Sequence, residues 1–167
     1  MTPSQTEGQD ATAALLARLA SQRLTIAVAE SLTGGALTAE LTRPAGASAV
    51  VVGGAVVYAT ELKHTLIGVD AALLAEQGPV HPEVARQLAR GARTALAVDG
   101  RPADVGVATT GVAGPDGQGG RAPGTVFIGV SVGEHDDAIE LELSGSRAEI
   151  REASVRAAVQ ALTDRLL

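Results

Sequence analysis

The chain has 167 residues, 46% of them hydrophobic, and a formal net charge of -6. This length supports one domain with a sizeable core. The acidic charge and the scattered arginines exclude the basic stripe of a nucleic-acid-binding protein and the basic face of a membrane-surface helix. Because the chain has no cysteine, disulfides, thiolate zinc sites and a cysteine nucleophile are excluded as well.

Several other kinds of site are not expected. His64, His81 and His135 lack the spacing of metal ligands, so no metal is expected. The chain has neither a phosphate-binding Gly-rich loop ending in Gly-Lys nor the glycine spacing of a dinucleotide-binding turn, so no cofactor is expected. No apolar run is long enough to cross a bilayer and the N-terminus has no signal pattern, which predicts a cytoplasmic protein.

Hydrophobic periodicity and turn residues define the predicted elements. The polar residues 1–10 are expected to form a disordered tail ahead of one domain over 11–167. Leucines at helical spacing predict the first helix, β-branched apolar runs predict buried strands, and Ile and Leu alternating with Glu over 139–143 predict an edge strand. The predicted elements, in order, are a helix over 11–21, a buried strand over 24–29, a helix over 36–41, a buried strand over 50–58, a turn into a helix at 58–63, a short helix that Asp70 caps and that ends near Gly78, a helix from Pro82 to about Ala97, strands over 104–110, 125–132 and 139–143, and a final helix from 147 almost to Leu167.

The order of these elements predicts the fold class. Strands and helices alternate early in the chain, and strands then follow each other in succession. Gly53 and Gly54, in the middle of a strand, indicate a bulge or a close backbone contact. We therefore expect an α/β protein, a three-layer α/β/α sandwich with a mixed five-stranded sheet.

The segment Glu30-Ser31-Leu32-Thr33-Gly34-Gly35 places hydroxyls and glycines where a strand turns into a helix. At a helix start, free N–H groups and the helix dipole favour a developing negative charge, and glycines let a substrate approach the backbone. Ser31 in this position suits a nucleophile. The alternative is that Ser31 is an ordinary helix N-cap.

Lys63 is the only lysine in the chain, beside twelve arginines. A guanidinium stays protonated at any working pH, whereas a desolvated ammonium can lose its proton, so only the lysine can serve as a base. The alternative is a surface lysine without a special role.

Two further segments carry candidate binding residues. Residues 111–124 contain six glycines and two prolines and predict a long loop without secondary structure, either functional or a flexible linker between strands. Ser146-x-x-Glu149 has the spacing of a capping box, which places Arg147 in the first turn of the final helix. A cation there opposes the helix dipole, so it needs solvent or an anion as its partner.

Four motifs together resemble the C-terminal domain family of the competence/damage-inducible protein CinA, over roughly residues 11–165. The stand-alone members of this family resemble nicotinamide-nucleotide amidases. The motifs are Ala29-Glu30-Ser31-Leu32-Thr33-Gly34-Gly35, the stretch from Gly54 through Tyr58 to Lys63, Thr110-Gly111-Val112-Ala113-Gly114-Pro115-Asp116-Gly117 with Pro123-Gly124-Thr125-Val126, and Ser144-Gly145-Ser146-Arg147.

The resemblance implies hydrolysis of the carboxamide of nicotinamide mononucleotide to nicotinate mononucleotide and ammonia. It implies Ser31 as nucleophile and Lys63 as its base. Tyr58 is expected to orient Lys63 or the pyridine ring, and Thr110 to hold the carboxamide or relay a proton. N–H groups near Thr33, Gly34 and Gly35, or at Thr110 and Gly111, are expected to bind the oxyanion, Gly114 to bind substrate, and Arg147 to bind the 5′-phosphate.

The sequence departs from the family at two places. Leu32 stands where the family usually has cysteine, which favours serine as the nucleophile, and Thr60 replaces the usual asparagine. Larger relatives carry an N-terminal molybdopterin-binding-like domain associated with nucleotide pyrophosphatase activity. This chain has no room for that domain, so no pyrophosphatase activity is expected.

The expected partner is therefore a small molecule, nicotinamide mononucleotide, with no nucleic acid and no membrane, and the protein is expected to be a homo-oligomer. The alternative function is a non-catalytic nucleotide-binding or regulatory module of the competence/damage-inducible type, which binds its ligand without releasing ammonia.

Overall fold

The computed structural model describes residues 10–166. The predicted tail over residues 1–10 lies almost wholly outside the described part of the chain. In order, the elements are α1 Ala11–Gln22, β1 Ile26–Glu30, α2 Ala36–Thr42, the 3-10 helix η1 Ala47–Ala49, β2 Val51–Val56, α3 Thr60–Thr65, α4 Ala71–Gln77, α5 Pro82–Ala95, β3 Val105–Gly111, β4 Thr125–Val132, β5 His135–Glu142 and α6 Arg147–Leu166.

The strands form one mixed sheet in the order β2-β1-β3-β4-β5. β1 pairs parallel with both β2 and β3, and the β3-β4 and β4-β5 pairs are antiparallel. β1 lies between its two parallel neighbours and all five of its residues are buried. The predicted mixed five-stranded sheet is confirmed.

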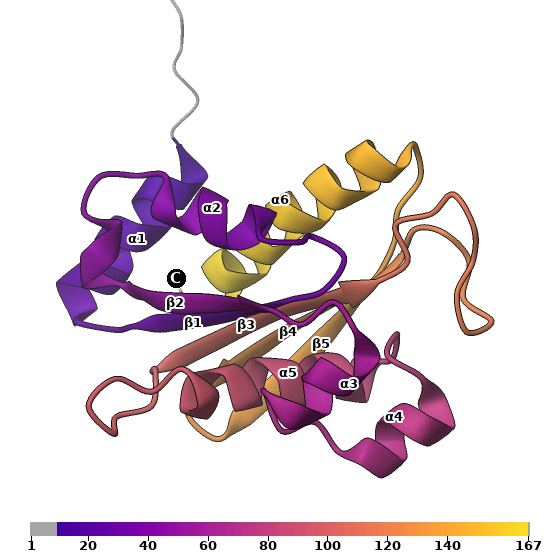
Figure 1. Ribbon diagram of the computed structural model, residues 1–167. Helices are drawn as coiled ribbons and strands as arrows, with labels where there is room; N and C mark the ends of the chain where they lie inside the picture. The colour runs from indigo at the N-terminus through magenta and orange to yellow at the C-terminus, as the bar shows by residue number, and fades with distance from the viewer. Residues whose placement is uncertain (1–9, 167) are drawn as a thin grey trace, which may run out of the picture.

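Helices cover both faces of the sheet, as Figure 1 shows. On one face, α1, α2 and α6 pack over an aliphatic core that includes Leu15, Leu37 and Leu162. On the other face, α5 crosses β1, β3 and β4 beside α3 and α4, with Val84 and Leu88 in its core. The predicted three-layer α/β/α sandwich is therefore confirmed.

Glycines at two strand positions allow α5 to lie close to the sheet. A Cβ at Gly106 of β3 would collide with Ala89 O, and one at Gly129 of β4 would collide with Ala85 O. On the other face, a Cβ at Gly54 would collide with the Thr38 hydroxyl. Near Gly53 the β1-β2 register shifts, so the bulge and the close contact predicted for this pair of glycines are both present.

One strand differs from its prediction in its surroundings. The run 50–58 is apolar and was expected to be a buried strand, but β2 is an edge strand whose residues are half-buried or exposed. An apolar sequence does not distinguish a strand with two neighbours from one whose outer side is open. At the opposite edge, β5 carries the predicted acidic alternation and is confirmed as an edge strand.

The described residues include no helix that is both long and apolar enough to cross a membrane.

Candidate active site

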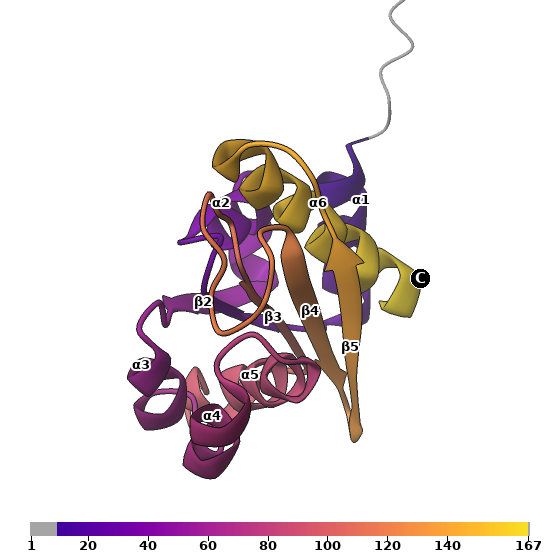
Figure 2. The ribbon, with the colours of Figure 1, turned by 90° about the vertical axis from the view of Figure 1, so that its right-hand side faces the viewer.

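The carboxyl ends of β1, β2 and β3 lie together at one end of the sheet, and Figure 2 shows the molecule from this end. Because the three strands are parallel, the turn after β1, the segment leading to α3 and the long loop after β3 all leave from this end. The turn after β1 leads to α2 on one face, and the segment after β2 leads to α3 on the other. Ligands of open α/β sheets bind where connections diverge in this way.

Ser31 and Lys63, the predicted nucleophile and base, meet at this end of the sheet. Lys63 Nζ lies 2.9 Å from Ser31 Oγ. Its other partners are carbonyl oxygens, Val57 O at 2.7 Å and Tyr58 O at 3.4 Å. Ser31 is 8% exposed and Lys63 is 1% exposed, so bulk water hardly reaches the pair.

Lys63 has no acidic partner, since none of the ion pairs found among residues 10–166 includes it. Burial lowers the pKa of the Lys63 ammonium from 10.5 to about 8. A neutral amine keeps two N–H donors and one lone pair. When Val57 O and Tyr58 O accept the two N–H groups, the lone pair is directed toward the Ser31 hydroxyl, which is the arrangement of a general base beside its nucleophile.

Glu30, the last residue of β1, organises the turn that carries Ser31. Its carboxylate is fully buried, so it requires hydrogen-bond donors on both oxygens. The donors are the Thr33 hydroxyl at 2.5 Å, Gly35 N–H at 3.0 Å, Leu37 N–H at 3.1 Å, and the Thr38 N–H and hydroxyl, each at 2.7 Å. The carboxylate thereby ties the end of β1 to the first turn of α2.

The structure corrects the predicted position of Ser31 at a helix start. α2 begins at Ala36 with Gly35 as its N-cap, and Ser31 lies in the preceding turn with its hydroxyl on Lys63. The Glu30 carboxylate accepts hydrogen bonds from the first N–H groups of α2. The helix dipole therefore stabilises this carboxylate instead of a substrate anion. Sequence reasoning missed this role, although an acid that ends an apolar strand ahead of several hydroxyl residues is the signal for it.

Arg151 of α6 holds the same turn from the other side. Its Nε donates to Leu32 O at 3.0 Å and its Nη2 donates to Thr33 O at 3.1 Å. Nothing in the sequence distinguishes Arg151 from the other arginines of α6, so sequence analysis did not select it. Together, Glu30 and Arg151 fix the backbone of the turn that follows Ser31.

The predicted substrate-binding residues Thr33, Gly34 and Gly35 belong to this turn and do not line the cavity described below. Thr33 is fully buried, with its hydroxyl between Glu30 and Thr109. Gly34 and Gly35 have φ angles of 58° and 103°, which a glycine adopts without strain. Their place in the fold indicates that they shape the turn.

The N–H groups of this turn differ in their availability for an oxyanion. Gly34 N–H donates to Ser31 O, and Gly35 N–H donates to Glu30. The N–H groups of Leu32 and Thr33 have no hydrogen-bond acceptor within residues 10–166. Of these two residues, Leu32 lines the cavity directly beside Ser31.

Thr110 closes the cavity on the β3 side. Its hydroxyl donates to Pro79 O at 2.6 Å, and the side chain is 1% exposed. The oxygen lone pairs remain able to accept a hydrogen bond, which fits the predicted contact with a carboxamide N–H group. The predicted loop is confirmed as long and without helix or strand over residues 112–124, whereas Gly111 is the last residue of β3.

Arg147 and Tyr58 form the outer wall. The predicted capping box is confirmed, because Ser146 N–H donates to Glu149 at 2.7 Å and Glu149 N–H donates to Ser146 Oγ at 3.3 Å. The Arg147 guanidinium donates to Gly114 O at 2.7 Å and to Tyr58 Oη at 3.0 Å, both neutral acceptors. Tyr58 is 59% exposed, and its backbone carbonyl, not its ring, contacts Lys63.

A cavity of about 270 Å³ lies between these groups. It is lined by most of the residues selected from the sequence, which come from the three connections at this end of the sheet and, for Arg147, from the start of α6. The lining residues are Ser31, Leu32, Tyr58, Lys63, Pro79, Val80, Thr110, Gly111, Val112, Ala113, Gly114, Asp116, Gly117, Gln118 and Arg147.

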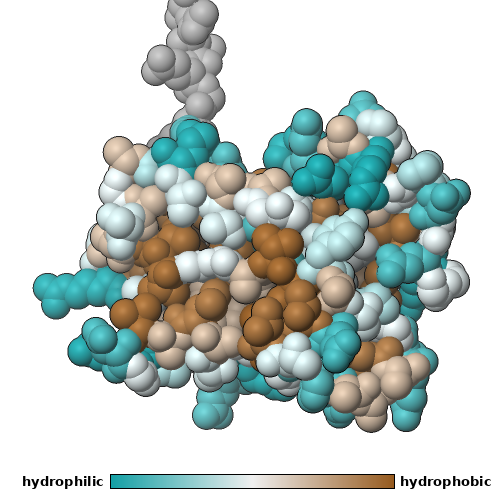
Figure 3. Space-filling view, in the orientation of Figure 1, coloured by the Kyte–Doolittle hydropathy of each residue, from teal (hydrophilic) through white to brown (hydrophobic). Residues whose placement is uncertain are grey.

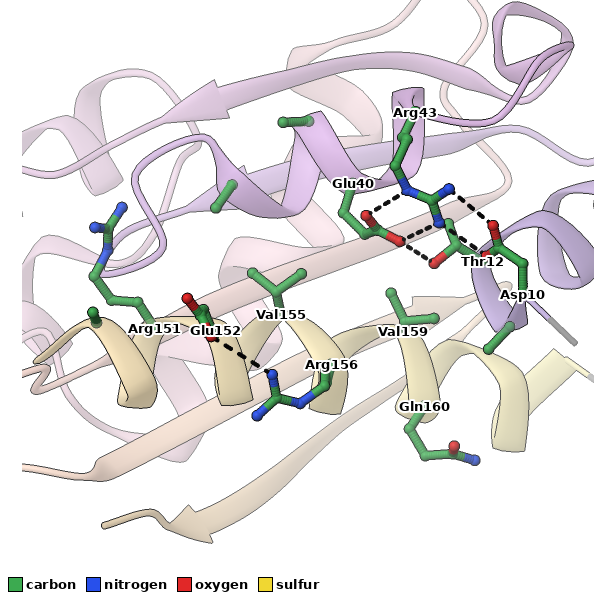
Figure 4. Close-up of a pocket in the computed structure, with 14 residues that line it drawn as sticks. Asp10, Thr12, Glu40, Arg43, Arg151, Glu152, Val155, Arg156, Val159 and Gln160 are labelled. Carbon is green, nitrogen blue, oxygen red and sulfur yellow. Dashed lines mark hydrogen bonds and ion pairs between the residues drawn. The ribbon is translucent and has the colours of Figure 1, made fainter. Parts of the chain in front are cut away.

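A larger groove of about 920 Å³ lies elsewhere, between α6 and the helices α1 and α2. Figure 4 shows Arg43 between Asp10 and Glu40 on its upper side, with the α6 side chains opposite. No group of three or more His, Cys, Asp or Glu side chains suited to a metal ion occurs within residues 10–166.

The chain matches known proteins over nearly its whole length. The family model described as "CinA C-terminal domain" matches residues 8–166. A competence-damage inducible protein of Bacillus velezensis is 42% identical over 133 residues, which cover 80% of this chain and 31% of that protein. One of Bacillus cereus is 41% identical over 139 residues, or 83% of this chain and 32% of that protein. The chain thus spans about a third of the length of these relatives.

Solved structures of similar proteins share the fold. A CinA superfamily protein of Enterobacter cloacae has a TM-score of 0.88 at 28% identity, over 94% of this chain and 90% of that one. A competence/damage inducible protein of Agrobacterium tumefaciens has a TM-score of 0.81 at 32% identity, over 92% of this chain and 94% of that one. The chain therefore belongs to the CinA C-terminal domain family.

Proposed function

We propose that this protein hydrolyses the carboxamide of nicotinamide mononucleotide to nicotinate mononucleotide and ammonia, with Ser31 as nucleophile and Lys63 as base. The observation that carries the proposal is the 2.9 Å contact between Lys63 Nζ and Ser31 Oγ, at a cavity where the lysine has no acidic partner among residues 10–166. An ammonium that burial has made more acidic can exchange protons with serine near neutral pH.

The first half of the reaction forms an ester. Ser31 Oγ attacks the carboxamide carbon while its proton passes to Lys63 Nζ. The backbone N–H of Leu32, which has no acceptor within residues 10–166, stabilises the oxyanion. When the C–N bond breaks, Lys63 returns the proton to the leaving nitrogen, and ammonia departs.

The second half restores the enzyme. Lys63 takes a proton from a water molecule, the hydroxide attacks the ester carbon, and the C–O bond to Ser31 breaks. Ser31 Oγ recovers its proton from Lys63, and nicotinate mononucleotide is released. No cofactor or metal takes part in these steps, because the proton transfers use only the serine, the lysine and water.

The other walls bind the rest of the substrate. The Thr110 oxygen accepts a hydrogen bond from the carboxamide, and Arg147 binds the 5′-phosphate at the outer end of the cavity. The charge of Arg147 supports this role, since its present partners Gly114 O and Tyr58 Oη are both neutral.

Incubation with nicotinamide mononucleotide, with ammonia and the acid product both measured, tests the proposal. The expected result is equal amounts of the two products from the native chain and neither from Ser31→Ala. Tight binding of the mononucleotide with no ammonia released would instead favour the non-catalytic nucleotide-binding module.

A further inference from the structure

The charged side chains that line the cavity leave Lys63 without a counterion. Apart from Lys63 itself, they are Asp116 of the loop after β3 and Arg147 of α6. Figure 3 shows hydrophilic residues gathered over the start of α6, the helix that carries Arg147. No charged group within residues 10–166 is hydrogen-bonded to Lys63. Its protonation therefore responds to the charge of the molecule that fills the cavity.

The other titratable groups on the elements around Lys63 are engaged elsewhere or face water. Both oxygens of the Glu30 carboxylate accept hydrogen bonds from the turn and from the start of α2. Glu61 and His64, the neighbours of Lys63 on α3, are exposed, so water and salt screen their charges. His81 accepts a hydrogen bond from a backbone N–H at the start of α5. The ammonium of Lys63 is thus not stabilised by any of them through a direct bond.

Burial alone leaves most of this ammonium charged at neutral pH. With a pKa of about 8, only about one Lys63 side chain in ten is neutral at pH 7. A general base must be neutral before it takes the proton of Ser31. The reaction therefore gains from any group in the complex that favours the neutral amine further.

The substrate of the proposed reaction carries such a group, because its pyridine nitrogen bears a permanent positive charge. Ser31 Oγ lies 2.9 Å from Lys63 Nζ. For attack, the carboxamide carbon must lie about 3–3.5 Å from Ser31 Oγ, and the ring nitrogen is three bonds further on, which places it roughly 5–8 Å from Nζ. Two like charges at this separation in a buried site disfavour the ammonium by about tenfold or more.

We propose that the positive charge of the pyridinium ring expels the proton of Lys63 to solvent when the substrate binds, so that the site selects carboxamides on a cationic ring. This inference rests on the proposed function and identifies the substrate class as N-substituted pyridinium amides. A neutral amide of the same shape binds without this effect. The product acts in the opposite direction, because the new carboxylate of nicotinate mononucleotide stabilises the ammonium.

Titration of Lys63 in the Ser31→Ala variant, which binds substrate without turnover, tests the proposal. Isotope labelling of the single lysine gives one side-chain resonance in the free protein and in each complex. With nicotinamide mononucleotide, the midpoint should lie at least about one pH unit below the midpoint with reduced nicotinamide mononucleotide. The reduced ring has no charge but excludes the same water. With nicotinate mononucleotide, the midpoint should lie above that with nicotinamide mononucleotide.

Asp116→Asn, made in the same variant, is the matched control for the protein's own charges. It removes the carboxylate that lines the cavity, so the difference between the oxidised and the reduced mononucleotide should persist. A difference that disappears in Asp116→Asn would assign the effect to this carboxylate and overturn the proposal.

The native chain provides a second measurement. The pH dependence of kcat/KM reports the free enzyme and that of kcat reports the complex, so the midpoint for kcat should be at least about one pH unit lower. Equal midpoints in this comparison, or equal Lys63 midpoints with the oxidised and the reduced mononucleotide, would overturn the proposal. A shifted Lys63 midpoint in a protein whose native form releases no ammonia would instead contradict the proposed function alone.

Discussion

The groove beside α2 and the cavity beside Ser31 differ in how their charges are balanced. In the groove, Arg43 donates hydrogen bonds to Glu40 and Asp10. These contacts raise the pKa of Arg43, and the bond from Arg43 lowers the pKa of Asp10 to about 2. In the cavity, the hydrogen-bond partners of Lys63 within the described part of the chain are all neutral oxygens, and burial lowers its pKa to about 8.

This difference distinguishes a site whose charged groups are paired from a site whose lysine can transfer a proton. Ion pairs in which both members keep their charge across the working pH range transfer no protons, whatever the size of the groove that they line. A buried lysine without a counterion can take up and release a proton near neutral pH. The groove is the larger of the two spaces, yet only the smaller cavity contains such a group.

Removal of the lysine amine should produce the largest effect. Lys63→Met keeps a side chain of similar length without a base, so turnover should fall at least about 100-fold, as should that of Ser31→Ala. The double variant should be little worse than either single one, because the two residues act as a unit. Arg43→Met is the matched control and should retain activity in the ammonia assay. An active Lys63→Met protein would remove the lysine from the mechanism.

The same amine should make stability depend on pH. The unfolded chain keeps the Lys63 proton up to about 10.5, whereas the folded chain releases it near 8, so the folded state binds fewer protons in between. Stability should therefore rise with pH through this window, by about 3 kcal/mol in total. Urea unfolding at several pH values measures the rise. Lys63→Met should lack it, and equal slopes for the two proteins would argue against the lowered pKa.

Glu30, beside the cavity, and Glu40, in the groove, allow the two sites to be compared for the effect of a carboxylate on the position of Ser31. Glu30→Gln replaces an acceptor by an amide N–H that faces backbone donors, so it should cost about 1–3 kcal/mol of stability. It should also lower kcat by roughly tenfold or more with little change in KM, because the turn that holds Ser31 shifts. Glu40→Gln, in the groove, should leave kcat unchanged. Similar kinetics for the two variants would show that Glu30 does not position Ser31.

Two arginines of α6, Arg147 at the cavity and Arg156 at the groove, should show the smallest difference between the two sites. Arg147→Ala should raise KM for nicotinamide mononucleotide roughly tenfold, since it removes charge-assisted hydrogen bonds to the phosphate. Its activity toward nicotinamide riboside, which lacks the phosphate, should not change. Arg156→Ala, whose side chain lines the groove, should affect neither substrate. Equal loss on both substrates with Arg147→Ala would assign the arginine to another part of the substrate.

The features predicted correctly from the sequence are those that local chemistry determines. Asp70 caps α4 through Ala72 N–H, Pro82 begins α5, and the Ser146–Glu149 capping box begins α6. Each depends on residues within a few positions of one another. The pairing of Ser31 with Lys63 came from the family resemblance, and the structure places the two side chains in contact.

Two of the features that were missed, the contact of Arg151 and the edge position of β2, depend on contacts distant in sequence. Arg151 reaches the Ser31 turn from the other end of the chain, and no local pattern reports that contact. The apolar sequence of β2 suited a buried strand, and only the strand order reveals that it is an edge. The role of Glu30 is different, because its donors Gly35, Leu37 and Thr38 follow it closely in the chain and an acid at the end of an apolar strand is a local signal for such a role.

A direct titration of Lys63 tests the central claim, that burial brings the loss of its proton close to physiological pH. Because Lys63 is the only lysine in the chain, selective isotope labelling of lysine gives a single side-chain NMR resonance that requires no assignment. The chemical shift should follow a midpoint near pH 8. A midpoint near the ordinary value of 10.5 would show that the ammonium keeps its proton and would contradict its role as the base for Ser31.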